Sequence, residues 1–118
     1  MLRLATLAAA AVLAVSAVPA LALDCPQPQP MAKPGILKET PAQIANVGKQ
    51  LTGGDTFNAI ASVTADLRIR YPGVEKAELV NYLLTAYCPA VAADAKLSEA
   101  QKKSTVDTFS AQVMRQLY

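Results

Sequence analysis

Apolar residues recur every three to four positions through most of the chain from residue 41 onward, which is the spacing of one helix face. Thr40 is followed by Pro41 and, three residues after the threonine, by Gln43. This is a capping-box pattern with proline at the first helical position. A first helix is therefore expected from Pro41 to the Gly53–Gly54 pair, with Ile44, Val47 and Leu51 on one face.

A second helix is expected after Asp55, whose side chain can cap its N-terminus. It should end at Tyr71–Pro72–Gly73, because a residue before proline avoids the helical conformation. Its apolar stripe consists of Phe57, Ile60, Val63, Leu67 and Tyr71.

A third helix is expected from about Val74 to Cys88, ended by Pro89. The pattern predicts that it buries Leu79, Val80, Leu83, Leu84 and Tyr87 and turns Glu75, Glu78, Asn81 and Thr85 to water. Ser98 and Gln101 form a second capping box, which opens a fourth helix with the stripe Val106, Phe109, Val113 and Leu117. No stretch alternates convincingly with the period of a strand. The pattern predicts an all-α domain over residues 39–118, a compact four-helix array.

The first 22 residues have the features of a secretory signal: a short basic start at Arg3, an apolar run, and Ala20–Leu21–Ala22 at the end. Cleavage is expected between Ala22 and Leu23. The alternative is an uncleaved membrane anchor, since residues 4–23 are nominally long enough to span a bilayer. The alanine-rich composition and Pro19 favour cleavage, after which no stable membrane anchor remains.

Residues 23–38 form a proline-rich arm that should be extended, because each proline fixes its own backbone and restricts the residue before it. Cys25 lies near its start. Asp24 stands where a lipidated cysteine needs a small residue, and the chain has no histidine for c-type haem attachment. Cys88 is the one other cysteine, and two cysteines in an exported chain most simply pair in an oxidising compartment. Two free thiols, or a bridge between chains, are the alternatives.

The charge and residue inventory exclude several classes of function. Without Arg3 the chain carries ten basic and nine acidic residues, a net charge of +1, which gives no electrostatic footprint for nucleic acid. The absence of histidine excludes Ser-His-Asp and Cys-His catalytic sites. The carboxylates fit solvated helix faces, with Asp66 and Arg70 spaced for an ordinary surface pair. We therefore expect neither enzyme activity nor a cofactor or metal.

The layout of a small all-α exported chain with cysteines at Cys25 and Cys88 resembles the HdeA-type acid-stress chaperones of the periplasm. The resemblance implies a periplasmic chaperone whose clients are unfolded envelope proteins. With no histidine, an acid response must come from protonating Asp and Glu side chains, below about pH 4. Apolar faces could then be uncovered for clients; the candidate client or partner residues are Phe57, Leu83, Leu84 and Phe109.

A second local likeness is "LSEAQ", residues 97–101, which is similar to a signature of the Spy/CpxP periplasmic chaperones. A capping box preceded by an apolar residue gives the same string. Two other functions remain open at this point: a structural or inhibitory partner subunit of one envelope protein, and a binder of small apolar ligands.

Overall fold

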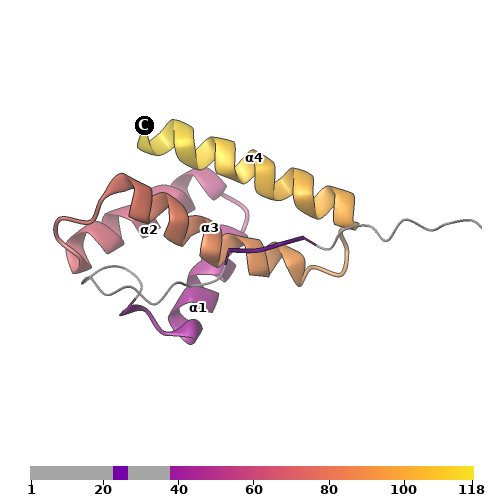
Figure 1. The fold of residues 1–118 in the computed structure, drawn as a ribbon, viewed down its shortest axis with the longest axis horizontal. Helices are drawn as coiled ribbons and strands as arrows, with labels where there is room; N and C mark the ends of the chain where they lie inside the picture. The colour runs from indigo at the N-terminus through magenta and orange to yellow at the C-terminus, as the bar shows by residue number, and fades with distance from the viewer. Residues whose placement is uncertain (1–22, 27–37) are drawn as a thin grey trace, which may run out of the picture.

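Four helices make up the part of the chain that the computed structural model describes, residues 23–26 and 38–118 (Figure 1). No strand occurs within these two ranges, so the all-α prediction is confirmed. The helices are α1 (Pro41–Leu51), α2 (Thr56–Arg70), α3 (Lys76–Ala92) and α4 (Glu99–Leu117).

The predicted caps fix three of the four helix starts. Thr40 Oγ1 accepts from the backbone N–H of Gln43, whose side chain accepts from the N–H of Thr40 in return. Ser98 and Gln101 make the same reciprocal pair at α4. Asp55 caps α2 by accepting from the N–H of Asn58. Each cap satisfies backbone donors that a helix start otherwise leaves without a partner.

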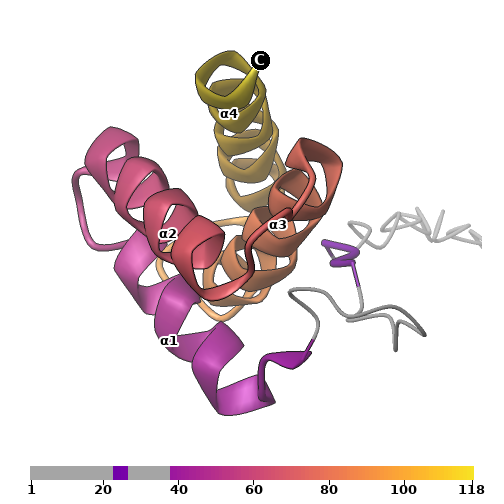
Figure 2. The same ribbon diagram turned by 90° about the vertical axis from the view of Figure 1, so that its left-hand side faces the viewer.

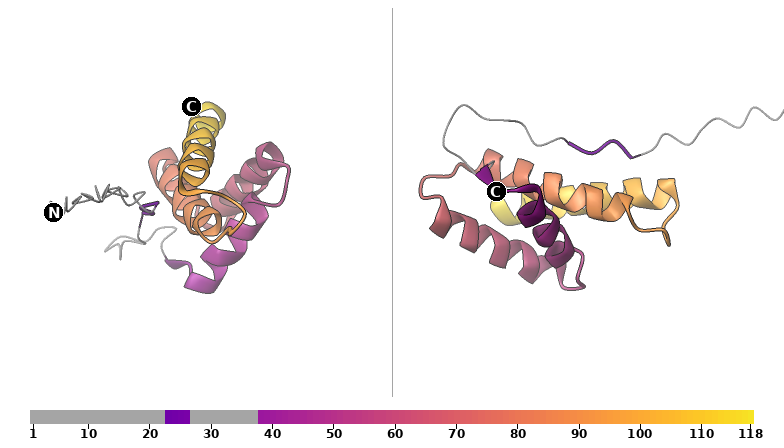
Figure 3. Two further views of the ribbon diagram at one scale, coloured as in Figure 1. Left: turned by 90° about the vertical axis from the view of Figure 1, so that its right-hand side faces the viewer. Right: turned by 90° about the horizontal axis from the view of Figure 1, so that it is seen from below.

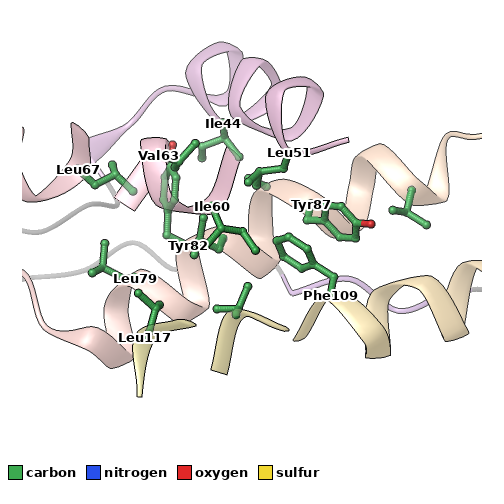
Figure 4. Packing of buried hydrophobic residues seen from close by; sticks show 14 residues of the cluster. Ile44, Leu51, Ile60, Val63, Leu67, Leu79, Tyr82, Tyr87, Phe109 and Leu117 are labelled. Carbon is green, nitrogen blue, oxygen red and sulfur yellow. The ribbon is translucent and has the colours of Figure 1, made fainter. Parts of the chain in front are cut away.

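The core lies around α3, against which α1 and α4 make most of their contacts (Figures 1 and 4). The rings of Tyr87 on α3 and Phe109 on α4 stack with centroids 3.7 Å apart. On the other side, α1 approaches α3 so closely that a Cβ atom at Gly48 would overlap the backbone carbonyl oxygen of Ala86. The core residues are Ile44, Leu51, Ile60, Val63, Leu67, Leu79, Tyr82, Leu83, Ala86, Tyr87, Val91, Phe109, Val113 and Leu117.

The third helix differs from its prediction at its C-terminal end. Pro89 does not end α3, which continues to Ala92. Proline inside a helix removes one backbone hydrogen bond and costs about 3 kcal/mol. The additional turn buries Val91 in the core, and this packing offsets the cost. Thr85, expected in water, is also buried, and its hydroxyl donates to the carbonyl of Asn81 within the same helix.

Phe57 also departs from its prediction, because 59% of the residue is exposed. The buried side of α2 consists of Ile60, Val63, Thr64 and Leu67. Phe57 lies on the neighbouring line of positions, four residues before the exposed Ala61. An apolar residue on the edge of a helical stripe can fit the period and still face solvent.

The disulfide between Cys25 and Cys88 is present and confirms the predicted intramolecular pairing, with Cα atoms 5.5 Å apart. It holds residues 23–26 beside the C-terminal half of α3 (Figures 1 and 3). The backbone N–H of Leu23 also donates to the Glu99 carboxylate at the start of α4. The expected signal over residues 1–22 and the arm residues 27–37 lie outside the described residues. Within the described ranges, no helix has the length and apolar character needed to cross a bilayer.

Candidate binding groove between α2 and α4

The helices α2 and α4 diverge from each other and touch at few points, leaving an open angle between them (Figure 2). A groove of about 660 Å³ lies along this angle. Its apolar residues include Ile60 and Leu117, which belong to the core, and Phe57 at the rim. The groove therefore exposes apolar surface next to the hydrophobic core of the domain.

One side chain joins α2 and α4 across the groove. Gln116, in the last turn of α4, donates from Nε2 to the backbone carbonyl of Phe57 in the first turn of α2, at 3.1 Å. Its Oε1 atom is buried without a hydrogen-bond partner, as is the hydroxyl of Thr64 on α2. This polar contact links the two helices across the groove, in addition to the core residues Ile60 and Leu117 that they contribute beside it.

The charged residues of the groove are both arginines, Arg68 on α2 and Arg115 on α4. No carboxylate lines it, and neither arginine forms an ion pair with any residue in the described ranges. Basic residues near helix C-termini complement the helix dipole. Because these two also remain free of carboxylate partners, the groove favours an anionic ligand.

A second feature is a charge cluster around the buried Glu39, where residues 38–40 meet α2. The side chain of Glu39 is 1% exposed, and its Oε1 forms an ion pair with Arg70 Nη2 at 2.6 Å. Arg70 Nε also donates to Asp66 at 2.9 Å, which confirms the predicted Asp66–Arg70 pair. The two carboxylates, Glu39 above all, raise the pKa of the Arg70 guanidinium, against an opposing effect of burial.

Tyr82 on α3 lies near this cluster, and the charges of the cluster affect the pKa of its hydroxyl. The residue is fully buried, and its hydroxyl has no hydrogen-bond partner. Burial raises the pKa of Tyr82 to about 12, because a phenolate would be poorly solvated there, and the negative charge of Glu39 adds to the effect. The cluster thus joins the start of the domain to α2 through one buried carboxylate, Glu39, and the partly exposed side chain of Arg70.

A third feature is a smaller groove of about 340 Å³ between α1 and α3, beside the disulfide. Its lining is largely apolar and includes Pro26, Ile44, Ala86 and Pro89, with Lys49 as the charged residue. Across residues 23–26 and 38–118, no group of three or more histidine, cysteine, aspartate or glutamate side chains is placed to hold a metal ion.

The four residues proposed as a client or partner surface do not form one surface in this state. Phe57 lies at the rim of the α2/α4 groove. Leu83 and Phe109 are buried in the core, and Leu84 is partly buried beside it. A client can reach the two buried residues only after the helices loosen.

Sequence reasoning missed Glu39, Arg115 and the groove itself. Glu39 precedes a capping box in a polar stretch, and nothing in that pattern distinguishes it from a solvated carboxylate. A signal for the groove does exist, because Phe57, Ala61, Ala65 and Ile69 follow one another at four-residue spacing. Comparison of the chain with protein-family models, with curated proteins and with solved structures finds no match in any of the three.

Proposed function

We propose that the protein is a small exported, non-enzymatic helical protein that binds segments of other envelope proteins and protects them from aggregation. The observation that carries this proposal is the α2/α4 groove, where the exposed ring of Phe57 adjoins apolar residues of the core. A concave site that combines apolar lining with a few polar groups is the usual form of a binding site. The disulfide supports export, because such bonds persist in oxidising compartments.

The Glu39–Arg70 pair supports an acid-responsive form of this activity. The pair joins the start of the domain to α2 through opposite charges. Strong acid, at about pH 2, neutralises carboxylates in general and so removes ion pairs of this kind. Loosening at this point frees the start of the domain from α2, and a wider separation of the helices in acid would then make the core residues Leu83 and Phe109 accessible. This agrees with the behaviour that the resemblance to HdeA-type chaperones implies.

A client-aggregation assay with the purified oxidised protein tests the proposal. Aggregation of an unfolded client is followed by light scattering at neutral pH and at about pH 2, where carboxylates are protonated. We expect protection that is stronger in acid. Glu39→Gln should give part of the acid-type protection at neutral pH, whereas the exposed control Asp107→Asn should behave as the wild type. Absence of protection at both pH values refutes the proposal.

A second candidate is binding of a small apolar ligand, which the apolar groove between α1 and α3 favours. Titration with a fluorescent fatty acid at neutral pH measures it. Saturable binding that Ala45→Trp at the groove abolishes would support this candidate over client protection.

A further inference from the structure

An uncovered apolar ridge runs along α2. Phe57, Ala61, Ala65 and Ile69 are spaced four residues apart and therefore align on one side of the helix. All four are exposed, with Ile69 exposed at 78%. The ridge spans thirteen residues, and the twelve steps from Phe57 to Ile69 rise about 18 Å at 1.5 Å per residue. This length matches about three turns of a partner helix.

The ridge suits close packing by another helix. Residues four apart form the ridges that interdigitate when two helices pack with axes about 8–10 Å apart. Ala61 and Ala65 lie in the middle of the ridge and also line the groove, so a backbone can approach closely there. Phe57 and Ile69 provide larger apolar contacts at the two ends.

The two arginines at the rim of the groove determine which charge a partner helix should carry. Arg68 stands on the α2 side of the groove and Arg115 on the α4 side, with no carboxylate between them. A partner helix with an apolar stripe flanked by carboxylates meets both arginines while it covers the ridge. A basic or neutral helix would meet the same apolar surface without this pairing, so charge complementarity selects an acidic segment.

We propose that the α2/α4 groove docks an acidic amphipathic helical segment of another protein, as a fifth helix packed between α2 and α4. This inference deepens the proposed function by naming the class of segment that the groove takes. The apolar stripe of the segment lies on Phe57, Ala61 and Ala65 in the groove and reaches Ile69 beyond the groove lining, and its carboxylates face Arg68 and Arg115.

The test uses two synthetic helical peptides of equal length with the same leucine stripe, one flanked by glutamates and the other by lysines. Binding to the full oxidised protein is measured by fluorescence anisotropy. We expect the acidic peptide to bind at least about tenfold more tightly, the effect of about 1.4 kcal/mol, and to weaken as salt is added. Equal binding of the two peptides overturns the proposal.

Variants locate the site. Arg68→Glu with Arg115→Glu should reverse the preference between the peptides, whereas Lys96→Glu with Lys103→Glu makes the same charge change outside the groove and should keep it. Ala61→Trp, on an exposed position, should block binding with the melting temperature retained. Alanine-methyl NMR of the unaltered protein gives a check without substitution: the acidic peptide must shift Ala61 and Ala65. Shifts confined to Ala45, Ala86 and Ala90, at the other groove, overturn the proposal.

Two further outcomes separate this inference from alternatives. Vesicles of anionic phospholipid that bind through Phe57 and Ile69 while the acidic peptide does not would assign the surface to membranes instead. Client protection that survives in Ala61→Trp would overturn the groove as the docking site and leave the proposed function intact. If the protein binds the acidic peptide but gives no client protection, the docking site stands and the proposed function is refuted.

Discussion

The contact between α1 and α3 leaves no room for a side chain at Gly48, and replacing this glycine with alanine tests that contact directly. A Cβ atom at residue 48 would overlap the carbonyl oxygen of Ala86 and lie 3.3 Å from the Cβ of Ala90. The obstacle is backbone within α3, so a rotamer change cannot relieve it. The two helices must move apart along a contact that buries Ile44 and Leu51.

The expected change in stability is the difference between a gain in helix propensity and a cost of overpacking. Glycine inside a helix is about 1 kcal/mol less favourable than alanine, so the substitution gains that amount through the backbone. Forcing a methyl group into a packed contact costs about 1–3 kcal/mol, and an overlap with backbone belongs at the upper end. We therefore expect Gly48→Ala to lower the free energy of unfolding by about 1–2 kcal/mol, a drop of about 4–16 °C in melting temperature for a domain of this size.

The assay is urea unfolding followed by circular dichroism, with the disulfide intact in every sample. Gly53→Ala is the matched control, because a Cβ there meets only ordinary contacts, the nearest being the Gln50 carbonyl oxygen at 3.4 Å. The control should be neutral or stabilising by up to about 1 kcal/mol. If Gly48→Ala stabilises the protein as much as Gly53→Ala does, the close approach of α1 and α3 is wrong.

Two more predictions concern Tyr82 and the disulfide. The pKa of Tyr82 is raised from 10.0 to about 12 in the folded state, so the stability it provides is complete below pH 10 and is lost as pH rises toward 12. Unfolding in guanidinium chloride between these pH values should show that the free energy of unfolding falls by roughly 2–3 kcal/mol. Most of this fall should be absent in Tyr82→Phe. The remainder arises from Tyr87, because burial also raises the pKa of that residue. An unchanged alkaline loss in Tyr82→Phe would contradict this. For the disulfide, Cys25→Ser with Cys88→Ser should lower stability by about 4 kcal/mol, because the bond joins residues 63 positions apart. Equal urea midpoints for the oxidised protein and the double variant would contradict it.

The four helices follow from local chemistry that the sequence shows directly. Capping boxes at Thr40 and Ser98 and the glycine pair after α1 mark helix ends within a few residues, because backbone hydrogen bonding is satisfied locally. The predicted end of α3 was wrong because the rule for proline is also local, while the burial of Val91 that overrides it depends on the other helices.

The features of the groove depend on which helices meet and at what angle, and the sequence does not show this. Phe57 fits the apolar period of α2 but lies at the edge of its buried stripe, beside the groove that α4 leaves open. Glu39 is buried because Arg70, thirty-one positions further along, reaches it. The local sequence around a polar residue in a connecting segment does not indicate that such a distant residue will pair with it.

The disulfide also determines how the protein would respond to a mechanical pull on its two ends. The bond from Cys25 to Cys88 closes a covalent ring that contains α1, α2 and most of α3, whereas α4 lies outside the ring. Tension therefore passes through the bond and cannot stretch the ring. On the C-terminal side of the ring, the thirty residues after Cys88 can extend, to about 100 Å at 3.3–3.6 Å per residue. A motor that pulls the C-terminus into a narrow pore would therefore unfold α4 first and then meet the disulfide, beyond which the chain can enter only as more than one strand.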